Sequence, residues 1–482
     1  MKKQENAKHR VARFIAFLIS ILSCFATLSG CEKNDAITLR VLVEESTYET
    51  IGFHSQLNRW IAEFEAEHEG ITIVLEQLPQ DSESRNPMLQ QIRSELMSGN
   101  GPDILILPNA LSDQDALNPK KPLFNDVAQA MRNGLFSDLS DFYDQDDSLG
   151  TADLQEAVMD AGVVDGHRYV LPLRYDLPVV YVDKTAFSQT GLDAGIFESS
   201  VIGYMDAVTE MENSSYASNF RMHWIRFQFF FNFFPKLIDY DTGKVSLQKE
   251  DVSAFLRSYQ DYWVRLLPAL KSSALSQRPF YKYYCADGAY WTDTGNFLFI
   301  GSLQQGMETV TIARTKGIEL DMYPIRATDG SVIADVTWYG AVSSGCKNKE
   351  LAYEFLRAFL TEDFQWEKNL EDIYGIWQPA AYGWPVRAKG SVSALAKVIE
   401  KRTRLSFSAN NREVNLEGIG DQEMPILGIH IDQARFSIPL EREFANALSA
   451  LYDRHTQQAT NIDIDQMAQD WLDKLQLHID EG

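Results

Sequence analysis

The sequence predicts an α/β protein built on a mostly parallel sheet that helices cover on both faces. Strand-like and helix-like segments alternate between residues 37 and 107, and such alternation is typical of parallel strands joined by crossover helices. The 482 residues are 45% hydrophobic and 23% charged, which is ordinary for globular proteins. The length indicates two to four domains, or two large lobes.

Five segments in order support this fold class. Residues 37–43 alternate and are rich in β-branched side chains, which predicts a strand, and residues 71–77 predict a second one. Residues 55–67 place apolar side chains at helical spacing, and residues 87–98 repeat that pattern. Residues 103–107 form a near-continuous apolar strand. In such a sheet, the loops after the strands form a cleft.

The second half of the chain is rich in helical patterns. Residues 351–360 predict a strongly amphipathic helix, and residues 440–477 predict two helices separated by residues 457–461. Residues 239–244 (DYDTGK) predict a turn in a hairpin or between helices. Residues 227–234 (FQFFFNFF) are too short to span a membrane and are expected in the core.

The N-terminus has the pattern of an export signal. Five basic residues lie within residues 1–13, and an apolar run follows at residues 14–29. The run ends in Leu28-Ser29-Gly30-Cys31, which resembles the lipobox of bacterial lipoproteins. This resemblance implies cleavage before Cys31, a diacylglyceryl group on its thiol and acyl anchoring to the membrane. The alternative is an uncleaved transmembrane anchor.

The charge of the chain excludes one class of partner. The net charge is −24, with 44 basic and 68 acidic residues. Without the first 30 residues it becomes −28. A field of that sign repels phosphate backbones, so no nucleic-acid partner is expected. Whether Cys285 and Cys346 form a disulfide is left open.

Motifs for catalysis and cofactor binding are missing from the sequence. It contains no Gly-x-Ser-x-Gly, no His-Glu-x-x-His, and no Walker or Rossmann glycine pattern. The eight histidines show no metal-ligand spacing. We therefore expect no enzyme, no cofactor and no metal. Because the chain is rich in carboxylates, an exported glycan-cleaving enzyme that uses two of them stays open as an alternative.

Five segments in order resemble the carbohydrate-type (family 1) extracellular solute-binding proteins of ABC importers, the group that includes maltose-binding protein. They are the opening strand with the helix after it, residues 88–107, residues 164–187, residues 340–364 and the C-terminal helices at residues 439–477. Where the family has Tyr-Asn-Lys after its first crossing strand, this chain has Tyr181-Val182-Asp183-Lys184. The match is poor at residues 188–290 and 388–435.

The resemblance implies a two-lobed periplasmic-binding-protein-like fold (type II), with a mostly parallel sheet in each lobe and hinge crossings between the lobes. Crossings are expected at residues 171–176, near 336–340 and near 373–377. The implied organisation is a signal peptide (1–30), a lipidated Cys31 with a short linker (31–36), an N-terminal lobe (37–172 and 341–372) and a C-terminal lobe (173–340 and 373–482).

Polar candidates for ligand binding follow strands. Glu44 and Glu45 come after the first strand and Asn109 after the strand at 103–107, so they should lie at the cleft edge. Helix capping or a solvated loop is the alternative role. Asp176 lies where relatives place an acidic ligand contact, and Arg174 and Tyr175 flank it. A hinge salt bridge between Arg174 and Asp176 is the alternative.

Aromatic candidates would stack on the apolar faces of a sugar, and polar groups would bind its hydroxyls. Trp338 and Tyr339 immediately precede the second crossing, and Trp377 lies at the third. Asp293 is a hydroxyl partner beside Trp291. The full set of aromatic candidates is Trp224, Trp291, Trp338, Tyr339, Trp377 and Trp384.

The expected function is that of a lipid-anchored, monomeric binding subunit on the extracytoplasmic face of the membrane. It would capture a solute, expected to be an oligosaccharide, between its lobes and deliver it to ABC permease subunits. A peptide, a polyamine or another non-sugar solute is the alternative ligand. A surface adhesin is the alternative of a different class.

Overall fold

The computed structural model describes residues 36–45, 51–109, 120–188, 193–212, 233–272, 298–303, 318–366, 383–387, 406–409, 412–415, 429–456 and 463–481. The predicted signal peptide, Cys31 and the crossing near 373–377 lie outside these residues. No helix among the described residues has the length and apolarity that a membrane span needs.

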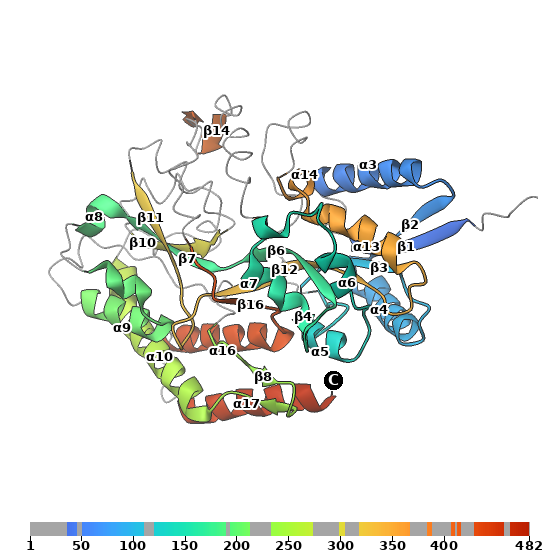
Figure 1. The fold of residues 1–482 in the computed structure, drawn as a ribbon. Coiled ribbons are helices and arrows are strands. Elements are labelled where there is room, and N and C mark those ends of the chain that lie inside the picture. Colours follow the sequence, from blue (N-terminus) through green and yellow to red (C-terminus); the bar gives the residue numbers. More distant parts are fainter. Residues whose placement is uncertain are drawn as a thin grey trace, which may run out of the picture.

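The predicted order of elements at the start of the chain is confirmed (Figure 1). Asp81 caps the second helix by accepting a hydrogen bond from the Ser84 amide at 2.8 Å. Asp126 caps a later helix by accepting one from the Gln129 amide at 3.0 Å. The elements up to the first crossing are β1 (Ile37–Glu44), α3 (Ile51–Glu67), β2 (Ile71–Leu78), α4 (Ser82–Met97), β3 (Ile104–Pro108), α5 (Val127–Arg132), α6 (Ser140–Asp144), α7 (Glu156–Met159), β4 (Val163–Val164), β5 (His167–Arg168) and β6 (Val170–Asp176).

The remainder of the chain alternates short strands with longer helices. The predicted turn at residues 239–244 connects two paired strands and is therefore a hairpin. The elements are β7 (Pro178–Asp183), α8 (Lys184–Ser188), α9 (Val201–Glu212), β8 (Ile238–Asp239), β9 (Lys244–Val245), α10 (Lys249–Ser272), β10 (Leu298–Ser302), β11 (Leu320–Pro324), β12 (Ile333–Val342), α13 (Lys349–Arg357), α14 (Glu362–Trp366), β13 (Trp384–Pro385), β14 (Ser406–Ala409), β15 (Arg412–Asn415), β16 (Gln433–Arg435), α16 (Pro439–Thr456) and α17 (Ile464–Glu481).

The larger sheet has the strand order β13-β6-β12-β3-β1-β2, and β16 pairs with β12. Strand β1 pairs in parallel with β2 and β3, whereas β12 runs antiparallel to both β3 and β6. The smaller sheet, β10-β7-β11, is antiparallel throughout. The prediction of a mostly parallel sheet in each lobe is therefore wrong in this detail. β12 runs in the opposite direction to β1, whereas β6, which is antiparallel to β12, runs in the same direction as β1 and β3.

Buried apolar side chains form two clusters. The first surrounds the large sheet, and the second joins the smaller sheet to α9, α10, α16 and α17. Strand β7 lies between them, since Tyr181 belongs to the first cluster and its neighbours Val180 and Val182 to the second. Phe233 and Phe234, at the end of the aromatic segment, lie in the second cluster as expected for core residues.

The chain passes between the clusters at three described places. These are Leu177 between β6 and β7, residues 325–332 between β11 and β12, and residues 436–438 between β16 and α16. The crossings predicted at 171–176 and 336–340 fall on β6 and β12, the strands that adjoin the first two passages. The lobe boundaries at residues 172 and 340 remain predictions.

Candidate functional site

The carboxyl ends of β1 and β3 place Glu44 and Asn109 at one edge of the large sheet. The two strands are parallel and in register, with Val43 opposite Ile106. Both polar residues are buried, with 5% of Glu44 and 3% of Asn109 exposed. Polar side chains buried at this edge need partners from neighbouring elements, and the structure supplies them.

Arg85 of α4 is the partner of Glu44. It donates to both carboxylate oxygens of Glu44, at 2.5 and 2.8 Å, and this pair is almost fully buried. The same guanidinium donates to the carbonyl oxygens of Pro79 and Lys121. The Glu44–Arg85 pair therefore holds α4 at the end of β1, and the Arg85 guanidinium also binds the two loops that contain Pro79 and Lys121. Its predicted ligand contact would have to come in addition to this bidentate pair.

Arg85 was not predicted, although the sequence carries a signal for it. Arg85, Leu89, Ile92 and Leu96 recur at helical spacing and are the buried residues of α4. A basic residue on an otherwise apolar stripe must have a buried acidic partner or extend its head to water. Glu45, in contrast, accepts a hydrogen bond from the Gln80 amide at 2.7 Å and lies near the surface.

Arg174, Tyr175 and Asp176 end β6, directly before the chain passes to the second cluster. Arg174 donates to the Phe364 carbonyl oxygen at 3.1 Å, and Asp176 accepts from the Leu177 amide at 2.9 Å. All three residues are buried. Burial raises the pKa of Tyr175 well above its usual value, so its hydroxyl stays protonated. These three consecutive residues lie directly before the passage at Leu177.

Asp335 lies opposite Asp176, on the neighbouring strand β12. Its Oδ1 accepts hydrogen bonds from the Ser437 amide (3.1 Å), the Ser437 hydroxyl (2.5 Å) and the Asn109 side-chain amide (3.3 Å). The Asn109 backbone amide also donates to the Thr337 carbonyl oxygen at 2.8 Å. Asp335 thereby connects the end of β3, the β12 crossing strand and the third passage. Asp335 was not predicted, although a single carboxylate in the otherwise largely apolar segment IADVTWYGAV indicates a buried polar contact.

Burial raises the pKa of Asp335 to about 7, against the hydrogen bonds from Ser437, which lower it. The ordinary value is 3.8. Between these two values the folded protein holds a proton that the unfolded chain releases, so stability falls as the pH rises from about 4 to about 7.

We expect the melting temperature to decrease over this pH range, and the decrease to be smaller in Asp335→Asn. Thermal unfolding at half-unit pH steps measures it. The exposed Asp473→Asn is the matched control and should keep the parent's slope; an equal slope in both variants would exclude Asp335 as the group responsible.

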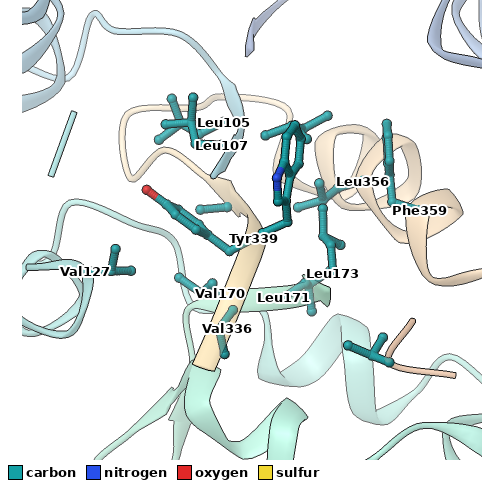
Figure 2. Packing of buried hydrophobic residues seen from close by; sticks show 14 of the residues in the cluster. Leu105, Leu107, Val127, Val170, Leu171, Leu173, Val336, Tyr339, Leu356 and Phe359 are labelled. Carbon is teal, nitrogen blue, oxygen red and sulfur yellow. The ribbon is translucent and has the colours of Figure 1, made fainter. Parts of the chain in front are cut away.

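Trp338 and Tyr339 lie in the core of the large sheet, each 2% exposed. All ten residues of β12 are buried because strands flank it on both sides. The Trp338 ring meets Phe53 of α3 edge to face at 5.4 Å, and the Tyr339 ring meets Phe436 in the same way at 5.5 Å. Stacking on a sugar requires an accessible ring face, which neither residue presents in this state. Figure 2 shows side chains of the core around Tyr339, which include Leu105, Leu107, Val127 and Val170.

The other predicted residues either have a defined position in the fold or lie outside the residues that the structure describes. Trp384 is buried in β13, which pairs with β6. Cys346 is free and buried, and burial raises the pKa of its thiol to about 12. Among the residues that the structure describes, no group of three or more His, Cys, Asp or Glu side chains could hold a metal ion. The predicted residues outside the description are Trp224, Trp291, Asp293, Trp377, Cys31 and Cys285.

Comparison with protein families gives a match for residues 51–212, to the family described as "Bacterial extracellular solute-binding protein". Those residues contain α3 to α9, and with them the Glu44-linked α4, Asn109 and the end of β6. The match covers about a third of the chain and agrees with the prediction of a solute-binding protein. A search of curated proteins finds no relative of significant similarity.

Solved structures match over nearly the whole chain. An oligogalacturonide binding protein from Yersinia enterocolitica is 13% identical, with 92% of this chain and 99% of that chain covered and a TM-score of 0.57. The galacto-N-biose-/lacto-N-biose I-binding protein of an ABC transporter from Bifidobacterium longum, in complex with lacto-N-biose, is also 13% identical, covers 93% and 99%, and has a TM-score of 0.54. A cyclic alpha-maltosyl-1,6-maltose binding protein from Arthrobacter globiformis is 14% identical, covers 92% and 100%, and has a TM-score of 0.51. At such identities these likenesses show the fold, and the predicted periplasmic-binding-protein fold class is confirmed.

Proposed function

We propose that this chain is a bacterial extracellular solute-binding protein, that it serves as the substrate-binding subunit of an ABC importer, and that it captures an oligosaccharide between its two lobes. The observation that carries the proposal is the fold, which solute-binding proteins share over more than nine-tenths of the chain. The sugar assignment is supported by three matched structures whose names state saccharide ligands.

The arrangement of the described site supports capture by hinge bending. The proposed ligand residues Arg174 and Asp176 end β6, directly before the passage at Leu177, and Asn109 follows β3, which pairs with the crossing strand β12. Small rotations at Leu177 and at residues 325–332 would bring the second cluster toward the edge that carries Asn109. Closure of this kind buries a ligand and removes water from its polar contacts, which strengthens them.

The binding residues proposed at this edge and at the crossings are Glu44, Glu45, Asn109, Arg174, Tyr175, Asp176, Trp224, Trp291, Asp293, Trp338, Tyr339 and Trp377. Of these, Asp176 has the strongest support, because it lies directly at a passage and its carboxylate is held by the Leu177 amide. Trp338 and Tyr339 would need the packing around β12 to open before they could contact a solute.

We further propose that Cys31 carries a lipid that anchors the protein to the extracytoplasmic face of the membrane, next to its permease. The expected result for Cys31→Ala is loss of acylation, with the protein no longer held by a lipid. Metabolic labelling with an alkyne fatty acid, followed by membrane fractionation, measures both effects. Cys346→Ala is the matched control, since this buried thiol is not accessible to an acyl transferase. Equal labelling of the parent and Cys31→Ala would contradict the anchor.

A thermal-shift screen of the purified protein tests the ligand class. The panel contains lacto-N-biose, maltooligosaccharides, oligogalacturonides, peptides, polyamines and amino acids. A solute at 100 times its dissociation constant stabilises a protein by ~2.7 kcal/mol, which is readily detected. A saccharide that raises the melting temperature supports the proposal. A response to peptides or polyamines alone would keep the binding role and reject the sugar.

A further inference from the structure

The chain contains two Asn–Gly pairs, and each lies at the C-terminal end of a helix. Asn100–Gly101 follows α4 and Asn133–Gly134 follows α5, with both asparagines exposed. An asparagine before glycine is chemically vulnerable, because glycine has no side chain to hinder attack of its backbone nitrogen on the asparagine Cγ. Since the two pairs have the same sequence, a difference in their reactivity has to come from their surroundings.

The backbone nitrogens of the two glycines differ in their hydrogen bonding. The Gly134 amide donates to the Met131 carbonyl oxygen at 3.0 Å. Among the contacts of the described residues, the Gly101 amide donates to no oxygen. A bonded amide has to give up its hydrogen bond before its nitrogen can lose a proton and attack, whereas the Gly101 nitrogen has no such bond to lose.

A cation contacts the peptide group that joins Asn100 to Gly101. Arg40 Nη1 donates to the Asn100 carbonyl oxygen at 2.8 Å. The nitrogen of this same peptide group is the Gly101 nitrogen. A positive charge at the oxygen therefore stabilises the negative charge that develops when this nitrogen loses its proton. Arg40 is itself held in place by Glu76 at 2.5 Å and by Glu95 at 3.1 Å.

We propose that Asn100 is a site of spontaneous deamidation, and that Arg40 accelerates the reaction by activating the Gly101 nitrogen. The leaving nitrogen is Asn100 Nδ2, which donates to the Ser98 carbonyl oxygen at 3.1 Å. The Gly101 nitrogen forms a bond to Asn100 Cγ, the bond from Cγ to Nδ2 breaks, and the proton of the Gly101 amide leaves with Nδ2 as ammonia. Water then opens the cyclic succinimide at either of its carbonyl groups, which gives aspartate or isoaspartate at position 100. No solute takes part, so the inference is independent of the proposed binding function.

The products alter a close contact between two loops. A Cβ added at Gly345 would lie 2.4 Å from the Gly99 carbonyl oxygen, so the two backbones leave no room between them. Isoaspartate lengthens the backbone by one methylene next to this contact, and tightly packed groups cannot absorb such a change without cost. The deamidated protein, separated by ion exchange, should therefore melt at a lower temperature than the parent.

The test compares the two Asn–Gly pairs within one sample. The purified protein is aged in mildly alkaline buffer, and peptide mapping by mass spectrometry measures deamidation at both positions. Labelling by isoaspartyl methyltransferase identifies the isoaspartate product. The native protein should deamidate faster at Asn100 than at Asn133, and in urea, where the surroundings are lost, the two rates should differ much less. A native rate at Asn133 that equals or exceeds the rate at Asn100 would overturn the site.

Substitutions of Arg40 test its part in the reaction. Arg40→Met should slow the native reaction at Asn100 by ~3- to 10-fold, as expected for loss of one hydrogen bond from a charged donor, and leave the rate at Asn133 unchanged. Arg40→Lys, which keeps a cation, should recover part of the lost rate. Arg59→Met is the matched control, because Arg59 forms an exposed pair with Glu63 within α3. An unchanged rate at Asn100 in Arg40→Met, with circular dichroism showing an intact fold, would overturn the role of Arg40.

Discussion

Replacing Arg85 with methionine is expected to lower the free energy of unfolding by ~3–5 kcal/mol, because it leaves the Glu44 carboxylate buried without a counter-charge. The pair has side-chain exposures of 3% and 6%, so water cannot replace the lost partner. The same substitution removes the hydrogen bonds to the Pro79 and Lys121 carbonyl oxygens. Urea unfolding followed by tryptophan fluorescence measures the loss.

Two further variants separate the charge from the packing. Adding Glu44→Gln to Arg85→Met removes the uncompensated charge and should recover part of the lost stability. Arg59→Met is the matched control on α3, where Arg59 forms an exposed pair with Glu63 and exposed pairs contribute little. If Arg85→Met cost no more than Arg59→Met, Glu44 would not depend on Arg85 and the structural role assigned to this pair would be wrong.

Replacing Asp176 with alanine is expected to weaken solute binding by ~1–3 kcal/mol, or roughly 5- to 150-fold in dissociation constant. Asp176 is 7% exposed and lies at the last position of β6, directly before the passage at Leu177. A carboxylate there would bind a sugar hydroxyl in a site that closure shields from water, where a lost charged hydrogen bond is costly.

Isothermal titration with the saccharide found by screening measures the effect of Asp176→Ala. Asp329→Ala is the control, since Asp329 lies in the exposed turn before β12 and bonds only within that turn among its described contacts. A melting temperature close to the parent's shows that the variant is folded. Unchanged affinity in folded Asp176→Ala would remove this residue from the site.

Much of the fold follows from local patterns in the sequence. The pattern over residues 37–107 predicted β1, α3, β2, α4 and β3 to within a few residues. Most of these elements bury one face at their own period, and β3, which is buried on both faces, is continuously apolar. The two C-terminal helices were predicted in the same way. The direction of β12, opposite to that of β1, could not be predicted, since this strand joins the large sheet through contacts distant in sequence.

The site was predicted less completely because pairing partners are set by the tertiary structure. Asn109 was predicted as a ligand residue from its position after a strand, and Asp176 from its position before a passage; both stay predictions. The position of a residue relative to a strand could not show that Glu44 forms an ion pair with Arg85. It also could not show that Asp335 accepts hydrogen bonds from both Asn109 and Ser437. Trp338 was predicted to stack on a ligand from its place beside the crossing, whereas the central position of β12 in the large sheet buries its ring.

The central claim is that the protein binds an oligosaccharide and releases it unchanged. Isothermal titration of the purified protein with the screened saccharide, followed by chromatography of the recovered sugar, tests both halves of the claim in one sample. The account predicts saturable one-site binding and quantitative recovery of intact sugar after prolonged incubation. Absence of saturable binding for every saccharide, or recovery of shortened sugars at enzymatic rates, would contradict it.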